Sequence, residues 1–383
     1  MCPEDWRPSS RTLARRWGWA GDSDNPISCD CDDVQFRGVL LISTWLARIL
    51  SRNALLVVLA LLIVAFTLLL PHTFPTAFNF RLLSSEKSVV ALLALAVLVP
   101  LSANHYDLSV GSVLGLVAII TIGFQVNGGM PWKLAVALAI TAAAFVGAIN
   151  GLLVTRFRVG SFIATLGVGT VVYGVGLWYT GGEQVNGNLP NEFLQIASPL
   201  FGMPLPAIIA LVVATLMWLL YSFFPIGRYL YIIGDNPRAA ELIGIPVKRY
   251  TFLAFVASGV LTGLSGVILA AELRVGQSAV GPEYLLPAFA AVLFGATSIN
   301  PGRVNVWGTI CAVLVLAVAV SGLEQEGAQA YVEPMFNGGM LIIAVAIAAH
   351  VTARNGVGTK VAKPSPDVPP VINSAKTESD AAT

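Results

Sequence analysis

Charged residues are scarce in this sequence. Only 11% of its 383 residues are Asp, Glu, Lys or Arg, whereas 56% are hydrophobic. A soluble domain carries about 25% charged residues, so this chain has less than half of the usual polar covering. Water alone is a poor solvent for so many apolar side chains. The composition therefore predicts that lipid surrounds much of the chain.

Cysteine is also scarce, and its placement gives no disulfide framework. Cys2, Cys29 and Cys31 lie in a polar leader, and Cys311 lies in an apolar run. Cys29 and Cys31 lack a second Cys or His pair at zinc-ligand spacing, so we expect no metal site. The net charge of +1 does not indicate a polyanionic partner. We therefore expect no nucleic acid partner and no cofactor.

Two features of energy-coupled proteins are missing. The sequence has no Gly-rich loop that ends in Lys-Ser or Lys-Thr, so it cannot hold ATP as a P-loop does. No charged residue lies near the middle of an apolar run, because Asp107, Glu272 and His350 fall at the edges. This pattern argues against a proton relay at membrane depth. We expect that the chain is not an enzyme and that any energy it uses enters through another polypeptide.

Long apolar runs dominate what is present. A helix needs about 20 apolar residues to cross a bilayer, and this rule predicts about ten spans. The spans cover residues 54–70, 88–99, 108–124, 134–154, 161–178, 204–223, 251–272, 284–299, 304–322 and 336–352. The expected fold class is an all-α polytopic membrane protein. Its parts are a polar leader at 1–45, a transmembrane domain at 46–354 and a disordered tail at 355–383.

Lysine and arginine set the expected orientation in the bilayer. If the N-terminus is cytoplasmic, the inner connections hold Arg156, Arg228 and Lys248 among other basic residues. The outer connections hold fewer basic residues, among them Arg81 and Lys87, and they collect several acidic ones. Basic residues concentrate on the cytoplasmic side of membrane proteins. Both termini are therefore expected in the cytoplasm.

Glycines recur at four-residue spacing within the expected spans. Such pairs let helices approach closely in lipid, where dispersion contacts replace the hydrophobic effect as the packing force. The alternative role for some of them is as hinges of a moving gate. The pairs are Gly111 and Gly115, Gly147 and Gly151, and Gly259 and Gly263.

The longest inner connection, residues 224–250, predicts a short helix. Asp235 and Asn236 suit the N-cap, Pro237 suits the first turn and Gly244 suits the position after the C-cap. A helix from 237 to 243 is too short to be stable alone in water. It must therefore dock either on the inner face of this protein or on a partner.

A polar stretch interrupts two apolar runs at residues 100–112. Polar backbone at membrane depth is tolerated only against protein or a watery cavity. Asp107 either caps the helix expected from residue 108 or belongs to a gate or pathway, with His105 and Ser109 as neighbours.

With these motifs the sequence resembles the permease subunits of ribose-type ABC sugar importers. The motifs occur in the order of that family over roughly residues 50–352. The motifs are Asp107–Ser112, Asn150–Arg156 followed by Ser161–Gly167, Gly227–Ile245, and Phe294–Arg303 followed by Trp307–Thr309.

The resemblance implies partners and a place in the cell. Such permeases pair with a second permease copy, as a homodimer or heterodimer, in the bacterial inner membrane. They take sugar from an extracytoplasmic sugar-binding protein, and a cytoplasmic ATP-binding subunit drives them. They are built from two related halves of inverted topology.

The resemblance also implies roles for particular residues. The ATPase-coupling helix would include Asp235, Asn236, Pro237, Ala239, Ala240, Gly244 and Ile245. The candidate pathway residues are His105, Asp107, Ser109, Asn150, Phe162 and Thr165. Family members often have Gly-Gly-Ile where this chain has Asn104-His105-Tyr106, which suggests a substrate preference other than ribose.

Three alternatives remain open at this point. A permease of the same architecture could carry a branched-chain amino acid or a nucleoside. An ion-coupled secondary carrier would need no ATPase, and a sodium site built from carbonyl groups would leave no trace in the sequence. A membrane scaffold or receptor that transports nothing would give no reason for the polar break or for the short helix.

Overall fold

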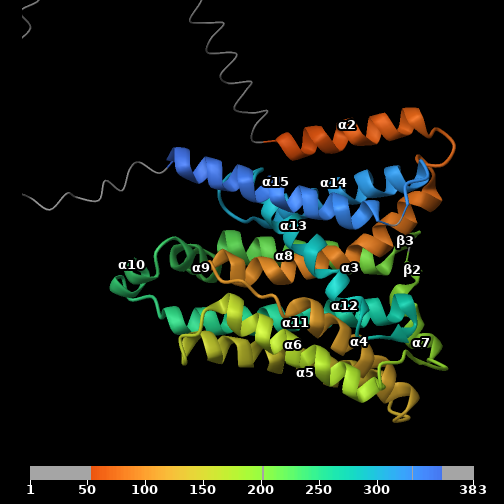
Figure 1. Ribbon diagram of the computed structural model, residues 1–383, viewed down its shortest axis with the longest axis horizontal. Helices are drawn as coiled ribbons and strands as arrows, with labels where there is room; N and C mark the ends of the chain where they lie inside the picture. Colours follow the sequence, from red (N-terminus) through yellow and green to blue (C-terminus); the bar gives the residue numbers. More distant parts are fainter. Residues whose placement is uncertain (1–52, 201, 330, 356–383) are drawn as a thin grey trace, which may run out of the picture. The chain divides into compact units, whose positions relative to one another are not determined.

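The computed structural model describes residues 53–200, 202–329 and 331–355. The leader expected at 1–45 and the tail from residue 356 lie outside the described residues. The described part is almost entirely helical, and Figure 1 shows most of the long helices running roughly parallel or antiparallel to one another.

Six of the described helices are long and apolar enough to cross a membrane, by length and composition. They are α3 (Ala77–Ser102), α5 (Trp132–Thr155), α6 (Ser161–Thr180), α8 (Leu205–Phe223), α11 (Val247–Leu273) and α14 (Val306–Gln325). Shorter apolar helices accompany them: α2 (Ala54–Leu69), α4 (Val110–Val126), α12 (Val280–Glu283) with α13 (Leu285–Gly295), and α15 (Val332–Asn355). Each expected apolar run overlaps one of these helices. The expectation of an all-α polytopic fold is confirmed.

Short elements lie at the two ends of the long helices. At one end are α9 (Pro225–Asp235) and α10 (Pro237–Leu242), which we call the α10 end (Figure 1). The other end, which we call the β end, carries α7 (Asn191–Leu194), the 3-10 turn η2 (Gln195–Ala197) and two antiparallel strand pairs. These pairs are β1 (Val185–Asn186) with β4 (Val275–Gly276), and β2 (Pro199–Leu200) with β3 (Met203–Pro204).

Helix α3 corrects the second expected span. The range 88–99 was too short at both ends, because α3 runs from Ala77 to Ser102 and contains Arg81 and Lys87, which we had expected in a connection. Thr76 caps its start by accepting a hydrogen bond from the backbone N–H of Asn79 at 3.1 Å. Pro100 lies in the last turn, where it removes only its own N–H from the helical ladder. Apolar length therefore underestimated this helix.

The core of the described part is built around α3. Its residues Leu92, Leu93, Leu95 and Leu98 are fully buried. The helix contacts α8, α11, α13 and α14, so protein surrounds it on several sides. By contrast, Trp178 of α6 is 83% exposed, as expected of a side chain that faces lipid or a partner. An apolar run in a sequence does not distinguish these two positions.

Helices α5 and α11 approach each other closely at glycines. A methyl group at Gly147 of α5 would lie 2.4 Å from the carbonyl oxygen of Phe255, and one at Gly259 of α11 would lie 2.4 Å from that of Ala143. Any side chain at these two positions would overlap the facing backbone. Gly151 and Gly263 lie at the same contact, where methyl groups would lie 3.1 Å from Phe252 O and from Ile140 Cα, respectively.

The remaining glycine pair lies where α4 meets α12. A methyl group at Gly111 would lie 3.2 Å from the carbonyl oxygen of Gly281, and one at Gly115 would lie 2.9 Å from that of Ser278. Each of the glycines expected to pack helices therefore lies at a helix contact. Their alternative role as hinges stays a prediction, as does the relation between two inverted halves.

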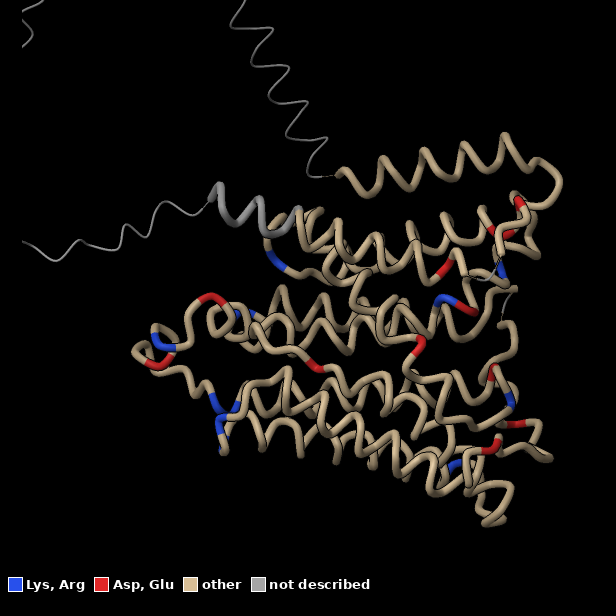
Figure 2. Tube along the Cα trace, viewed as in Figure 1, with Lys and Arg blue, Asp and Glu red and all other residues tan. Residues whose placement is uncertain are grey.

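Charged residues gather toward the ends of the helices. Figure 2 shows long stretches of the central helices without charge and clusters of Lys, Arg, Asp and Glu near the α10 end and toward the β end. This distribution is expected of a chain that places its middle in hydrocarbon.

Candidate functional site

Asp107 is the centre of a buried polar cluster. The residue is 2% exposed. Its Oδ1 accepts hydrogen bonds from the backbone N–H and the hydroxyl of Ser109, at 3.1 and 2.6 Å. Its Oδ2 accepts one from the hydroxyl of Ser258 at 2.9 Å, and the amide of Asn150 donates to Ser109 Oγ at 2.7 Å. The cluster joins the start of α4 to α5 and α11.

The position of Asp107 corrects the expectation that it lies at the edge of a span. Its carboxylate contacts Ser258, which lies near the middle of α11. After α3 the chain turns back at Asn104, which has a left-handed φ of 58°, and Asp107 is buried although Tyr106 before it is 39% exposed. Asp107 accepts the Ser109 N–H just before α4, which begins at Val110 rather than at residue 108. Among the described residues no cation pairs with this carboxylate, which its hydrogen bonds must stabilise.

The other candidate pathway residues divide into two groups. Thr165 of α6 is fully buried, and its hydroxyl oxygen accepts a hydrogen bond from the backbone N–H of Leu108 at 3.0 Å. The His105 ring lies 6.0 Å from the Phe255 ring, centroid to centroid. Phe162 is 53% exposed and does not join the cluster. Five of the six candidates therefore lie in or beside one region, and Phe162 lies on an open face of α6.

Sequence reasoning missed Ser258. It lies 151 residues from Asp107 in the chain, and only the packing of α11 brings the two together. The available signal was a serine beside Gly259 within an apolar run, which is also common at ordinary helix contacts. The cluster has a second unusual feature, because Asn150 Oδ1 is buried without a hydrogen-bond partner.

The short helix α10 has a cap at each end. The Asn236 side chain accepts hydrogen bonds from the backbone N–H groups of Arg238 and Ala239, both at 3.1 Å. At the other end Gly244 has a φ of 85°, and its N–H donates to Glu241 O while the Ile245 N–H donates to Ala240 O. This is the Schellman arrangement, which favours glycine because its φ is positive. In the structure the helix ends at Leu242, one residue before its predicted end at residue 243.

Helix α10 buries one side and exposes another. Ala240 is fully buried and Ile245 is 7% exposed, so these two residues hold the helix on this protein. Leu242 is 89% exposed and Ile243 is 67% exposed. Two large apolar side chains at the outermost point of the α10 end are costly to leave in water. They are suited to a hydrophobic groove on another protein.

The loop between α13 and α14 contacts α9 just before α10 begins. Asp235 is the last residue of α9, not a cap, and it forms an ion pair with Arg303 from the loop between α13 and α14. The Tyr231 hydroxyl donates a hydrogen bond to Val304 O at 2.7 Å, and the Arg303 guanidinium lies 5.8 Å from the centroid of the Tyr231 ring. Burial raises the pKa of Tyr231 to about 12, although the neighbouring Arg303 guanidinium acts to lower it. Sequence reasoning placed one helix in the connection 224–250 and missed α9.

Helix α9 could have been found from its spacing. Gly227, Leu230 and Ile233 recur every three residues and are all buried, while Arg228 on the opposite side is exposed. This spacing is typical of an amphipathic helix at a surface. Pro225 occupies its first position, as is common at helix starts.

Comparison with known proteins places this architecture among transport permeases. The family described as branched-chain amino acid transport system, permease component, matches residues 82–345. The ribose import permease protein of Bacillus subtilis (strain 168) is 33% identical over 289 residues, which cover 75% of this chain and 89% of that protein. The D-allose transport system permease protein of Escherichia coli (strain K12) is 30% identical over 290 residues, covering 76% of this chain and 89% of that protein.

A third relative is named for a different cargo. The autoinducer 2 import system permease protein of Yersinia pestis (strain Pestoides F) is 29% identical over 268 residues, covering 68% of this chain and 80% of that protein. No solved structure matches the chain. The matched region includes both the Asp107 cluster and α10.

Proposed function

This chain belongs to the family of branched-chain amino acid transport system permease components, and on that premise we propose that it is the permease subunit of an ATP-driven sugar importer. The cargo is a monosaccharide or a related small polyol. The names of the relatives support this choice, since they specify ribose, D-allose and autoinducer 2. The chain is a multi-pass membrane protein, and we place it in the bacterial inner membrane with α10 in the cytoplasm.

The exposed apolar tip of α10 is the observation that carries the coupling mechanism. Leu242 and Ile243 project from a helix that is capped at both ends and anchored by buried Ala240. We assign this tip to a groove on a separate cytoplasmic ATPase subunit. ATP binding draws two such subunits together, and each pushes on one α10 of a pair of permease copies. The pair then alternates between outward-open and inward-open states, because the ATPase contacts the two states differently.

The Asp107 cluster is the element that this movement acts on. It ties the segment after α3 to α5 and α11 through hydrogen bonds that can break and re-form. An extracytoplasmic sugar-binding protein delivers the cargo at the β end. The buried Asp107 removes one argument against a proton-coupled carrier, so the distinction from that class rests on the family and on α10.

Uptake into proteoliposomes tests the proposal. The chain is reconstituted with its ATPase subunit and binding protein, and uptake of labelled ribose, D-allose, leucine and adenosine is measured with and without internal ATP. We expect ATP-dependent uptake of a sugar and none of leucine or adenosine. Leu242→Asp should abolish uptake and co-purification of the ATPase. The matched control is Arg238→Gln, because Arg238 lies at the exposed polar start of α10. Leu253 of α11 is also exposed, but Leu253→Asp cannot serve as the control, because it would place a charge against lipid.

Two results would contradict the proposal. Accumulation by the chain alone under a sodium or proton gradient, without ATP, would identify a secondary carrier. ATP-driven uptake of leucine or adenosine in place of sugar would support the ATP-driven permease but contradict the assignment of a sugar as its cargo.

A further inference from the structure

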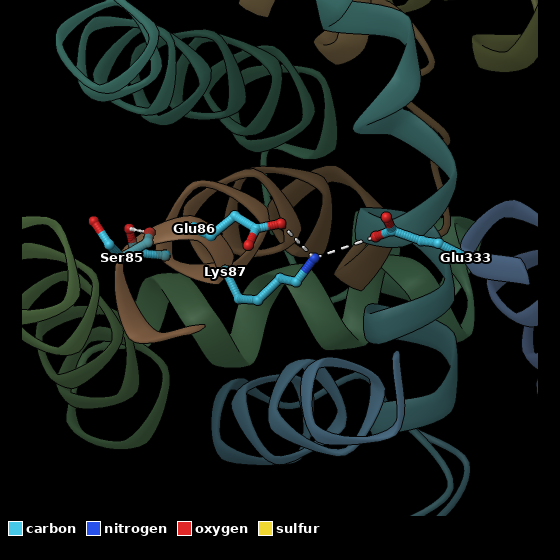
Figure 3. Close-up of polar contacts among 5 residues, drawn as sticks. Ser85, Glu86, Lys87 and Glu333 are labelled. Carbon is cyan, nitrogen blue, oxygen red and sulfur yellow. Dashed lines mark hydrogen bonds and ion pairs between the residues drawn. The ribbon is translucent and has the colours of Figure 1, made fainter. Parts of the chain in front are cut away.

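A charged cluster at the outer part of α3 takes no part in the coupling described above. Lys87 Nζ lies 2.9 Å from Glu86 Oε1 and 3.2 Å from Glu333 Oε1. Figure 3 shows the ammonium group between the two carboxylates, with Glu333 reaching across from α15, while Ser85 points to the other side of α3. The Lys87 side chain is only 14% exposed. Lys87 is also one of the residues that line a cavity toward the β end.

The cavity has a volume of about 200 Å³ and lies between α3 and α14. Leu82 and Leu83 give it an apolar side. Its polar lining is Asn79, Glu86, Lys87, Ser321, Glu324 and Gln325. Lys87 also borders a second cavity of about 20 Å³, which includes Glu333 and Asn337. Pockets for drug-sized ligands measure about 300–1,000 Å³, so the larger cavity suits a smaller solute.

Two side chains at these cavities, those of Gln325 and Asn337, leave hydrogen-bonding atoms unpaired. The Gln325 amide donates to Asn79 Oδ1 at 3.0 Å and to Ser321 Oγ at 3.2 Å, but its Oε1 is buried and has no partner. Asn337 is 4% exposed, and among the described residues its side chain makes no hydrogen bond. Buried polar atoms of this kind are normally satisfied by protein, water or a ligand. The cavity therefore calls for a molecule that donates hydrogen bonds.

The charges restrict which donor fits. Glu86, Glu324 and Glu333 oppose the single ammonium of Lys87, and this excess of negative charge disfavours a phosphorylated ligand. A metal ion is disfavoured for a different reason, because Lys87 Nζ already occupies the position between two of the carboxylates. Hydroxyl groups satisfy both needs, since each donates one hydrogen and accepts others.

We propose that the Lys87 cavity binds a small, neutral, polyhydroxylated solute and forms an entry subsite of the permease. The inference rests on the proposed function for the identity of that solute as cargo. The Glu86 and Glu324 carboxylates accept from its hydroxyl groups, and so does Gln325 Oε1 after the buried amide turns toward the cavity. The third N–H of Lys87 donates to one of its oxygens, and Leu82 and Leu83 face its C–H groups. Because the cavity is open on one side, binding is weak, as transfer onward requires.

Saturation-transfer difference NMR tests the subsite directly. The full chain in detergent is mixed with D-ribose, D-allose or ribitol, and saturation transfer to the sugar C–H hydrogens is measured. We expect transfer to at least one of the three. Gln325→Leu should weaken binding by about tenfold, because it removes an acceptor and leaves ligand hydroxyls unpaired. Glu86→Gln, at a side chain 55% exposed, should also weaken binding and is a second variant if Gln325→Leu does not fold.

The control variant is Glu326→Gln, which changes an exposed carboxylate one residue beyond the cavity lining. It should leave saturation transfer unchanged. No transfer from any of the three probes would overturn the proposal. So would unchanged transfer in folded Glu86→Gln, or displacement of the sugar by magnesium or ethylamine in preference to a second sugar.

The outcome can be separated from that of the proposed function. If saturation transfer behaves as expected but ATP-driven uptake fails, the subsite stands and the importer proposal falls. If uptake is ATP-driven and Gln325→Leu leaves its KM unchanged, the importer proposal stands and the subsite falls.

Discussion

Gly234 of α9 packs directly against the carbonyl oxygen of Ser102 at the end of α3. A methyl group at Gly234 would lie 2.4 Å from that oxygen and 3.3 Å from the Ala103 Cα. Ser102 begins the segment that leads to the Asp107 cluster, and Gly234 lies three residues before α10. Movement of α10 therefore has a short mechanical route, through backbone contact, to the segment that carries Asp107.

Gly234→Ala should interrupt this route. The added methyl group must push α9 away from Ser102, because a carbonyl oxygen cannot yield as a flexible side chain does. We expect sugar uptake to fall by at least about tenfold, the change that a 1.4 kcal/mol misfit produces. ATP hydrolysis by the assembled complex should continue.

The control for Gly234→Ala is Gly174→Ala on α6, where a methyl group would meet nothing within 4 Å. Uptake should be unchanged in this variant. Full uptake by Gly234→Ala would show that α9 does not act on the end of α3.

Removal of the Asp107 carboxylate should destabilise the protein as well as stop uptake. Asp107→Ala leaves the Ser109 and Ser258 hydroxyls and the Ser109 N–H without an acceptor inside the protein. Each unpaired buried donor costs about 1–3 kcal/mol. Thermal unfolding in detergent should therefore shift clearly downward. Thr170→Val is the matched control, because its exposed hydroxyl bonds only to Leu166 O of the same helix.

Gly244 should tolerate asparagine and reject valine. Its φ of 85° is costly for a β-branched residue, whereas asparagine adopts positive φ more readily. Gly244→Val should abolish uptake and stimulation of the ATPase, although the protein still reaches the membrane. Gly244→Asn should retain most of both activities. Normal uptake by the valine variant would remove α10 from the mechanism.

The contact between α5 and α11 should be intolerant of even one methyl group. Gly147→Ala or Gly259→Ala would place a carbon 2.4 Å from a facing carbonyl oxygen, so the helices must separate. Overpacking of this kind costs about 1–3 kcal/mol. The midpoint temperature of thermal unfolding in detergent should therefore fall. The control is Gly167→Ala, whose added methyl group has no atom within 4 Å and which should unfold at the same temperature as the unchanged protein.

The contact of Ser258 with Asp107 illustrates what a sequence cannot reveal. Apolar length located the helices, and the turn chemistry around Asn236 and Gly244 located α10 within one residue. Those signals are local, since each depends on neighbours within a few positions. Asp107 bonds to Ser109, two residues away, and to Ser258 of α11, and no local pattern relates a serine in one apolar run to a carboxylate beside another.

For the described residues, the sequence by itself therefore determined the membrane-spanning class, the number of apolar helices with their approximate bounds except those of α3, and the capped helix that begins at residue 237. Composition and backbone preference suffice for these features. Tertiary structure alone decided that α3 lies in the interior, that Asp107 is buried against α11, and that Lys87 borders a cavity with Gln325. The physical reason is that burial and hydrogen-bond partners depend on which helix faces which, and glycine contacts and side-chain shapes decide this only when the helices pack together.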